Sequence, residues 1–265
     1  PLNQEESSAA GDYDSIGMFE DGVARVTKGD KIGYVRKDYS YVVKPVWDSA
    51  FRAVNASDTN DGYYGYFHIK KGEKWGIVFM DGTVIEPVSE SMLSVGEYEI
   101  AVVTINGKQK YIKKDGKFLD NIEYQYAYPF SEGKGLVHTS YTECYFIDEN
   151  GKKVSGIYPT ATPYREGLAF VFTSSGGRFI DHNGNILLGE KVNFVHGFPF
   201  NKGIALALQY SGEKGINLYG LLKKDDTWLV APLFDRVEIL GDFNYKFYLN
   251  GNEAEVMPDG KINWK

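Results

Sequence analysis

The stretch KWGIVFMDGTVIEP, residues 74–87, decides the fold of this 265-residue chain. A run of mostly apolar residues leads to an Asp-Gly pair, and a second short apolar stretch follows the pair and ends at Pro87. Asp-Gly between two such stretches is a strong β-hairpin signal, because a type I′ turn needs positive φ at both central residues. Proline suits the end of the second strand, since it cannot donate to a central ladder. Residues 74–87 are therefore predicted to form two antiparallel strands.

The same strand–turn–strand pattern recurs along the chain, at intervals of 43, 34, 35, 33, 42 and 34 residues. Its turn-like pairs are Asp38-Tyr39, Asp81-Gly82, Asp115-Gly116, Asn150-Gly151, Asn183-Gly184, Asp225-Asp226 and Asp259-Gly260. Three residues before each pair there is an aliphatic residue, namely Val35, Val78, Ile112, Ile147, Ile180, Leu222 and Val256. The two pairs without glycine would be strained in a type I′ turn, so we expect longer loops there. The repeat predicts one continuous apolar interior built from the aliphatic positions.

Two further short segments accompany the hairpins. Before a hairpin, an aromatic residue and two polar residues precede a glycine and a short apolar strand, as in residues 19–26, 130–137, 164–171 and 200–207. After a hairpin there is a short aromatic–acidic segment, as in residues 47–50 and 234–237. Frequent aromatics and glycines suit many short strands joined by tight turns. We therefore predict an all-β fold of seven short antiparallel repeat units with about four strands each.

These units resemble the WG (KWG) repeat family of bacterial β-repeat proteins. Lys74-Trp75-Gly76-Ile77-Val78 matches the core that gives the family its name, and two other units carry this core with the tryptophan replaced, at residues 31–35 and 218–222. The remaining four units depart further and have Gln109-Lys110, Cys144-Tyr145, Gly177-Arg178 and Glu253-Ala254 at the Trp-Gly positions. The resemblance covers nearly the whole chain beyond residue 12. It implies a bacterial origin, often in the envelope or secreted, and it supplies no common catalytic residues.

The two ends of the chain suggest how the units close. The last unit, residues 245–265, lacks a final Tyr-Asp-like segment, and residues 12–16 (DYDSI) supply a spare one. This predicts a closed, propeller-like ring in which the N-terminal strand completes the last unit, with no free sheet edges. An open β-solenoid capped at both ends is the alternative. Residues 12–265 are expected to form a single WG-repeat domain, preceded by a flexible leader, residues 1–11, left by processing.

Charge and composition argue against several classes of function. The chain has 29 basic and 36 acidic residues, a net charge of −7, and no Lys/Arg run longer than two residues. Nucleic-acid binding needs cations that neutralise phosphates, so nucleic acid is not an expected partner. The single cysteine, Cys144, excludes an intramolecular disulfide, and no apolar run approaches the ~20 residues of a membrane helix. We expect an exported protein, periplasmic or at the cell surface, without a membrane span.

No residue pattern predicts a cofactor, a metal site or a catalytic apparatus. The histidines lack metal-ligand spacing, and we interpret all four as structural or surface residues: His68, His138, His182 and His196. Residues 58–62 (DTNDG) place glycine one position too early for an EF-hand loop. Cys144 stands at a tryptophan position, and we interpret it as a small buried substitute for that ring rather than a reactive thiol. The chain is therefore predicted not to be an enzyme.

Carboxylates recur just before the bend glycines, at Glu20-Asp21, Glu132 and Glu166. Acids that repeat with the fold are interpreted as serving the fold. The alternative is a carboxylate-dependent hydrolase acting on carbohydrate, and two non-repeating acids ~5 to 9.5 Å apart in one pocket would identify it.

Two insertions interrupt the repeat, at residues 57–65 and 209–217. Binding groups concentrate on loops of rigid scaffolds, and tyrosine offers a large, stiff contact surface, so the candidate binding residues are Tyr63, Tyr64, Tyr66 and Tyr210. Insertions without function are the alternative. We predict a non-enzymatic binding or scaffolding module of the bacterial cell envelope that presents its repeat surface to a protein or glycan. A structural spacer in a larger assembly is a further alternative.

Overall fold

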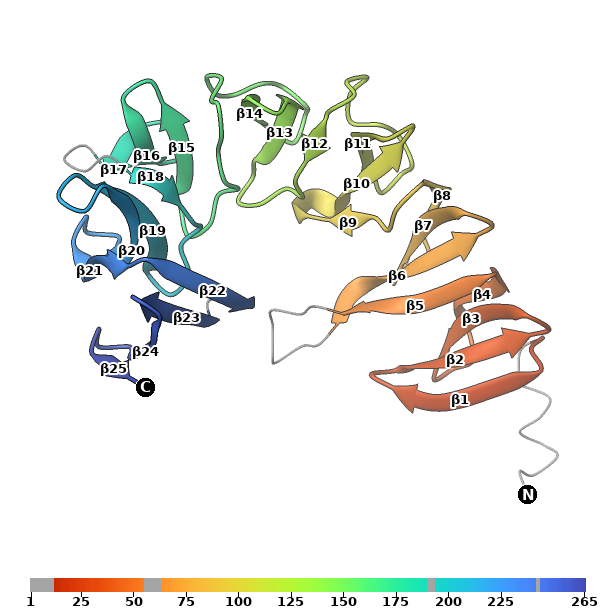
Figure 1. The fold of residues 1–265 in the computed structure, drawn as a ribbon. Coiled ribbons are helices and arrows are strands. Elements are labelled where there is room, and N and C mark those ends of the chain that lie inside the picture. Colours follow the sequence, from red (N-terminus) through yellow and green to blue (C-terminus); the bar gives the residue numbers. More distant parts are fainter. Residues whose placement is uncertain (1–11, 55–62, 190–193, 242–243) are drawn as a thin grey trace. The chain divides into compact units, whose positions relative to one another are not determined.

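The computed structural model describes residues 12–54, 63–189, 194–241 and 244–265 (Figure 1). Its regular structure is almost entirely β: the described residues contain no α-helix, and their only helical turn is the 3₁₀ turn Glu97–Glu99. Every strand pair in the described residues is antiparallel, and the strands are grouped into small sheets. The predicted all-β fold of short antiparallel sheets is therefore confirmed. Within these residues no helix is long and apolar enough to cross a membrane.

By its internal contacts the chain divides into two compact parts. The N-terminal part comprises residues 1–95 and 99–123. Its first sheet has the order β1-β2-β3-β4, with strands Ser15–Glu20, Val23–Lys28, Lys31–Arg36 and Tyr41–Trp47. Its second sheet has the order β5-β6-β7-β8, with strands Ser49–Val54, Tyr63–Lys71, Lys74–Phe79 and Val84–Ser89. Its third sheet has the order β11-β10-β9, and these strands are Lys108–Lys113, Ile100–Ile105 and Ser94–Val95.

The C-terminal part comprises residues 96–98 and 124–265. A three-stranded sheet contains β12 (Tyr126–Ala127), β13 (Gly135–Ser140) and β14 (Glu143–Ile147). A seven-stranded sheet contains β15 (Ala169–Thr173), β16 (Gly176–Ile180), β17 (Ile186–Leu188), β18 (Phe194–Gly197), β19 (Ile204–Ser211), β20 (Ile216–Lys223) and β21 (Trp228–Phe234). The last sheet contains β22 (Arg236–Gly241), β23 (Asn244–Leu249), β24 (Asn252–Val256) and β25 (Ile262–Trp264).

The terminal sheets correct one step of the sequence argument. β1 pairs with β2 and opens the first sheet, while β22 to β25 form a four-stranded sheet at the other end of the chain. The Tyr-Asp-like segment therefore begins a sheet instead of ending one, because Asp235 directly precedes β22 as Asp14 directly precedes β1. The prediction that the N-terminal strand completes the last unit is wrong. The closed ring, the open solenoid and the number of repeat units stay predictions.

The hairpin turns also differ from the expected type. In each of the seven predicted pairs, the second residue has positive φ and the first does not; the positive values are Tyr39 62°, Gly82 87°, Gly116 80°, Gly151 81°, Gly184 83°, Asp226 60° and Gly260 85°. The amide of the second residue donates to the carbonyl three residues earlier, at 2.8–3.2 Å. This is the three-residue loop in which a type I turn is followed by a left-handed residue. The type I′ prediction is wrong for the five glycine-containing pairs. For the other two pairs, the expected loop longer than a type I′ turn is confirmed, because three residues connect the strands instead of two.

The two pairs without glycine adopt the same loop because a neighbouring hydroxyl reinforces it. Asp38 Oδ1 accepts the backbone N–H of Ser40 at 3.0 Å and its hydroxyl at 2.6 Å. Asp225 Oδ1 accepts the same two groups of Thr227 at 3.1 and 2.5 Å. These bonds help to hold the left-handed residue between them, which strains a side chain other than glycine.

Six of the seven predicted interior aliphatics are buried, with 0–4% of their surface exposed, and Val256 is half-buried. Five of them belong to separate hydrophobic clusters, such as the one that contains Ile77, Ile85, Ala101 and Ile112. The predicted burial of these positions is confirmed for all but the last repeat, and one continuous interior along the whole chain stays a prediction.

Candidate functional site

The predicted binding tyrosines do not form one described site. Tyr63 and Tyr64 open β6, but their side chains and residues 55–62 lie outside the described residues. Tyr66 is buried, with 7% of its surface exposed, and its ring packs 6.3 Å from that of Phe79. Tyr210 belongs to the C-terminal part and is 57% exposed. Its segment is a longer hairpin and not a loop, because β19 and β20 continue in register up to the pair Ser211–Ile216. The binding role of these tyrosines stays a prediction.

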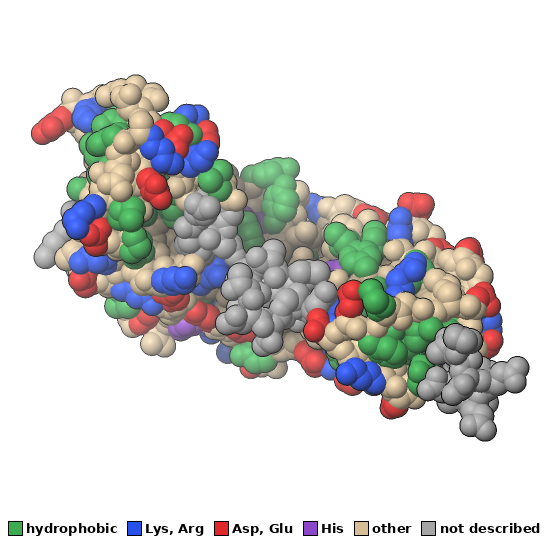
Figure 2. Space-filling view, turned by 90° about the horizontal axis from the view of Figure 1, so that it is seen from below, with side chains coloured by type: hydrophobic (Ala, Val, Ile, Leu, Met, Phe, Trp, Pro, Cys, Tyr) green, Lys and Arg blue, Asp and Glu red, His purple; other side chains and the backbone are tan. Residues whose placement is uncertain are grey.

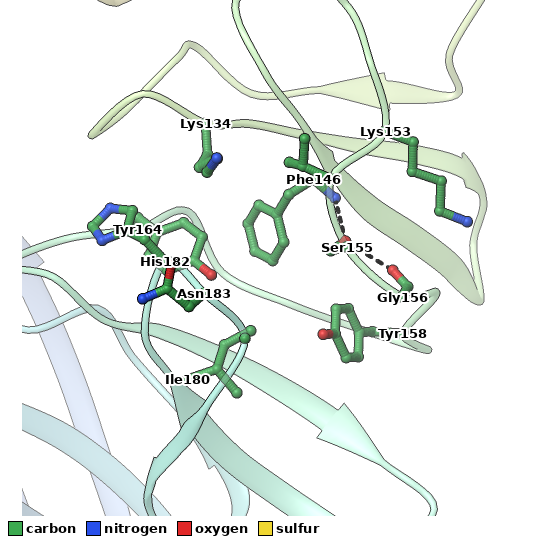
Figure 3. Close-up of a pocket in the computed structure, with 12 residues that line it drawn as sticks. Lys134, Phe146, Lys153, Ser155, Gly156, Tyr158, Tyr164, Ile180, His182 and Asn183 are labelled. Atoms are coloured by element: carbon green, nitrogen blue, oxygen red, sulfur yellow. Dashed lines mark hydrogen bonds between the residues drawn. The ribbon is translucent and has the colours of Figure 1, made fainter.

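A cavity of about 550 Å³ in the C-terminal part is the strongest candidate site (Figure 3). Its volume lies within the usual range for small-molecule sites, roughly 300–1,000 Å³. Figure 3 shows Lys134, Phe146, Tyr158 and Ile180 around the same space, with the hydroxyl of Tyr158 directed toward it. The cavity is lined by Lys134, Phe146, Lys153, Val154, Ser155, Gly156, Tyr158, Tyr164, Ile180, His182, Asn183 and Gly184.

The glycine of the Trp-Gly pair, here called the repeat glycine, lets the third and fourth strands of a sheet pack closely, and the hairpin beside the cavity has no such glycine. In the full repeats, the fourth strand bulges over the third at that glycine: a Cβ on Gly76 would lie 2.4 Å from the carbonyl oxygen of Ile85 and 2.8 Å from the nitrogen of Pro87. Gly33 has the same relation to Val43 and Pro45. The backbone therefore packs directly on glycine, and no other residue fits at this position without a shift.

In the hairpin β13–β14, Tyr145 stands where the full repeats have this glycine. Residues 153–158 form two isolated bridges with β14, Ile147–Lys153 and Cys144–Tyr158, and between these bridges four residues lie opposite two. The N–H of Val154 also donates to the carbonyl of Phe146 at 2.9 Å. This bulge supplies five of the twelve residues that line the cavity.

Ser155 holds the bulge in place. Its hydroxyl oxygen accepts the backbone N–H of Phe146 at 2.9 Å and its O–H donates to the carbonyl of Gly156 at 2.8 Å. Phe146 is 1% exposed, so its N–H has no access to water and needs this acceptor. A side-chain oxygen therefore replaces the carbonyl that a regular fourth strand would offer.

Three aromatic rings give the cavity an apolar wall with hydroxyl groups at its edge. The ring of Phe146 lies 4.8 Å from that of Tyr164 and 6.4 Å from that of Tyr158, and His182 stacks on Tyr164 at 4.4 Å with an angle of 15°. The hydroxyl of Tyr164 donates to the carbonyl of Asp181 at 2.8 Å. Burial raises the pKa of both tyrosines, so they remain neutral at physiological pH.

The lining of the cavity includes two lysines and a histidine but no carboxylate. The nearest recurrent acid, Glu132, accepts the N–H of Gly167 at 2.8 Å and lies 3.3 Å from Nε2 of His182. A local excess of basic groups contrasts with the net charge of −7 and with the mixed acidic and basic surface visible in Figure 2.

Two of the recurrent carboxylates, Glu132 and Glu166, bind the bend of the following repeat, and a further acid, Glu97, does the same. Glu97 accepts the N–H of Gly133 at 2.6 Å, and Glu166 accepts that of Gly203 at 3.0 Å, as Glu132 does for Gly167. The bend residues have positive φ in consecutive pairs, for example 51° and 78° at Glu132-Gly133, as a type I′ turn requires. These contacts support the interpretation that the repeated acids serve the fold.

Two other sizeable cavities each contain one carboxylate in their lining. One, of about 400 Å³, includes Glu20 and Arg52, and another, of about 380 Å³, includes Glu255 among mainly apolar residues. The pair of acids that would identify a glycosidase site is thus absent from the described lining of all three cavities. Within the described residues no group of three His, Cys, Asp or Glu side chains is placed to hold a metal ion.

Cys144 agrees with its interpretation as a buried substitute for a ring. It is fully buried beside Phe146 and Tyr164, and burial raises the pKa of its thiol to about 12, so no reactive thiolate forms at neutral pH. His68 and His196 have pKa values lowered by burial and pack against aromatic rings. His182 is the histidine whose place in a cavity wall the sequence did not reveal.

Comparison with known proteins supports the repeat and leaves the function open. The family described as "WG containing repeat" matches residues 9–31, 111–137 and 146–173, and the last region includes the bulge of the cavity. No curated protein matches the chain.

Solved structures that resemble this chain have low sequence identity. BamB from Moraxella catarrhalis has 8% identity and a TM-score of 0.37, covering 94% of this chain and 80% of that one. The WD40 β-propeller domain of Doa1 has 13% identity and a TM-score of 0.31, covering 92% and 88%. A structure titled as the eukaryotic initiation factor has 6% identity and a TM-score of 0.46, covering 91% and 72%. TM-scores below 0.5 do not define how the sheets are arranged. The family matches, in contrast, confirm the resemblance found in the sequence in three regions of the chain.

Proposed function

We propose that this protein is a non-enzymatic binding module of the bacterial cell envelope and that the cavity beside Tyr158 accepts a saccharide. One observation carries the proposal: a cavity of about 550 Å³ combines three aromatic rings with neutral hydroxyl and amide groups and has no carboxylate in its lining. Sugar rings present apolar C–H faces and hydroxyl edges, which match aromatic faces and nearby hydrogen-bonding groups.

The placement of the cavity adds to this proposal. Features that serve the fold recur in successive repeats, such as the bend carboxylates and the turn aspartates. The cavity instead is lined by residues of the irregular segment 153–158, which forms isolated bridges with β14 in place of a regular fourth strand. A rigid scaffold that carries an irregular concave site is typical of a recognition module. The envelope location belongs to the proposal and rests on the family resemblance.

An array of neutral and acidic oligosaccharides tests the function directly, with the full chain as the labelled probe. We expect wild-type protein to bind a subset of glycans and Tyr158→Ala to lose at least about tenfold in affinity, because it removes a ring and a hydroxyl from the wall. Tyr158→Phe keeps the packing and removes only the hydroxyl, so it separates loss of binding from loss of folding. Tyr141→Ala is the matched control, since Tyr141 is 76% exposed and lies outside the cavity lining.

Absence of binding to any glycan on the array would refute the proposal. Binding that Tyr158→Ala leaves unchanged would place the site elsewhere. A protein recovered from an envelope fraction, with no glycan bound, would favour the alternative of a protein-binding scaffold.

A further inference from the structure

We infer that the saccharide bound in this cavity carries a carboxylate group and that Lys134 is its ionic partner. This inference rests on the proposed function and adds the chemical class of the ligand. Its basis is the position of Lys134 in the cavity wall and the absence of a carboxylate partner for it within the described residues.

Lys134 is presented by a rigid backbone. It follows the Glu132-Gly133 bend, and its N–H and C=O exchange hydrogen bonds with Ser131 at 3.1 and 3.0 Å. The residue is half-buried and lines the cavity. Its ammonium group therefore approaches the cavity from a fixed Cα position, which limits the entropy lost when it binds an anion.

The charge of Lys134 is not neutralised within the described residues. No carboxylate there lies within ion-pair distance of Lys134, and the acid two residues earlier, Glu132, is already bonded to Gly167 and faces His182. Two other lysines of the chain are paired instead: Lys224 lies 3.0 Å from Glu166, and Lys114 lies 2.9 Å from Asp81. An unpaired ammonium group at the wall of a cavity without acids favours an anionic ligand.

The second lysine of the lining contributes only at longer range. The ammonium group of Lys153 lies 4.9 Å from the ring centre of Tyr145, which does not line the cavity, and its side chain extends away from the cavity in Figure 3. The direct ionic contact therefore falls to Lys134, with Asn183 and Tyr158 available as neutral hydrogen-bonding groups.

This set of groups suits a carboxylate better than a phosphate. Phosphate sites commonly use arginine forks or several converging backbone N–H groups, since the ligand carries nearly two charges. No arginine lines the cavity, and one ammonium group balances one carboxylate. The aromatic wall then accommodates the sugar ring to which the carboxylate is attached. Uronic and sialic acids are sugars of this class.

A panel of oligouronates and sialyl-oligosaccharides, each also prepared as its methyl ester, tests the inference by calorimetric titration of the full chain. The ester keeps the size and removes the charge. We expect at least one acid to bind and to bind at least about tenfold more tightly than its ester, as a charge-assisted contact predicts. Raising the salt from 0.05 to about 0.5 M should reduce this preference.

Lys134→Gln should abolish the preference for the acid while keeping the affinity for the ester. Lys152→Gln is the matched control, because Lys152 is exposed, adjacent to the bulge and outside the cavity lining. Tyr158→Ala should weaken acid and ester alike.

Equal affinity for acids and esters, or binding of neutral glycans only, would overturn the inference and leave the proposed function standing. A preference for the acid that survives in Lys134→Gln would overturn the role of Lys134. If no saccharide of either charge binds wild-type protein, the inference and the proposed function both fail.

Discussion

At the scale of single residues, Gly76 lies under the fourth strand of its sheet, and backbone atoms already fill the space above it. A Cβ at this position would be 2.4 Å from the carbonyl oxygen of Ile85, which is far inside van der Waals contact. The φ of Gly76 is not in the left-handed region, so the requirement comes from close approach of two backbones. The name-giving glycine of the repeat thus has a packing function, and Tyr145 stands at the corresponding position of the β13–β14 hairpin.

Gly76→Ala should destabilise the protein by about 1–3 kcal/mol, because the added methyl group overpacks a rigid contact. Gly65→Ala is the matched control: Gly65 also lies in the β5–β8 sheet, its φ is outside the left-handed region, and a methyl group added there would meet no atom within 4 Å. Urea unfolding of the two variants measures the difference. Equal stability of the two would contradict the packing role of the repeat glycine.

At the scale of elements, the seven hairpin loops share one geometry despite different sequences. Asp-Gly and Asn-Gly allow both a type I′ turn and the three-residue loop. The carboxylate of the turn favours the three-residue loop. In five loops the first residue of the pair is an aspartate, and its carboxylate accepts the backbone N–H of the residue two positions later. In the two loops that begin with asparagine, the aspartate two positions earlier, Asp148 or Asp181, accepts the backbone N–H of that asparagine. The turn is therefore stabilised by an ionised acid.

Asp81 makes this stabilisation dependent on pH. The N–H of Thr83 and the ammonium group of Lys114 lower the pKa of Asp81 from 3.8 to about 2. Because its pKa is lower in the folded protein, ionised Asp81 stabilises the fold at pH values above the pKa that it has in the unfolded chain. This contribution is lost as pH falls from about 4 to about 2. Asp81→Asn should therefore be less stable than wild type at pH 7, by less than about 1 kcal/mol because the side chain is largely exposed.

The difference between wild type and Asp81→Asn should shrink below pH 4 and vanish near pH 2. Urea unfolding at pH 7, 4 and 2.5 measures it, with Glu73→Gln as the control because Glu73 is 97% exposed. A difference between wild type and Asp81→Asn that stays constant over this pH range would contradict the account of the turn.

At the scale of the whole molecule, the sequence predicted the buried positions that recur in each repeat and missed the cavity, which does not recur. The buried positions from Val35 to Leu222 followed from spacing, since an aliphatic residue before each turn has one place to pack. The cavity depends on residues far apart in sequence, Lys134, the bulge 153–158 and His182, which no local pattern connects. The loss of glycine at Tyr145 was a weak signal, because three other repeats also lack this glycine. A more specific signal was Ser155-Gly156, where three other repeats have a proline-closed strand. The repeat indicates the scaffold, and its interruption indicates the site.

The most direct test of this account is amide chemical-shift mapping by NMR on the full chain, titrated with the tightest-binding saccharide from the array. The account predicts that the largest shifts fall on Lys134, residues 153–158 and residues 182–184. Shifts centred instead on residues 63–66 or on the hairpin of Tyr210, with the cavity residues unchanged, would contradict it.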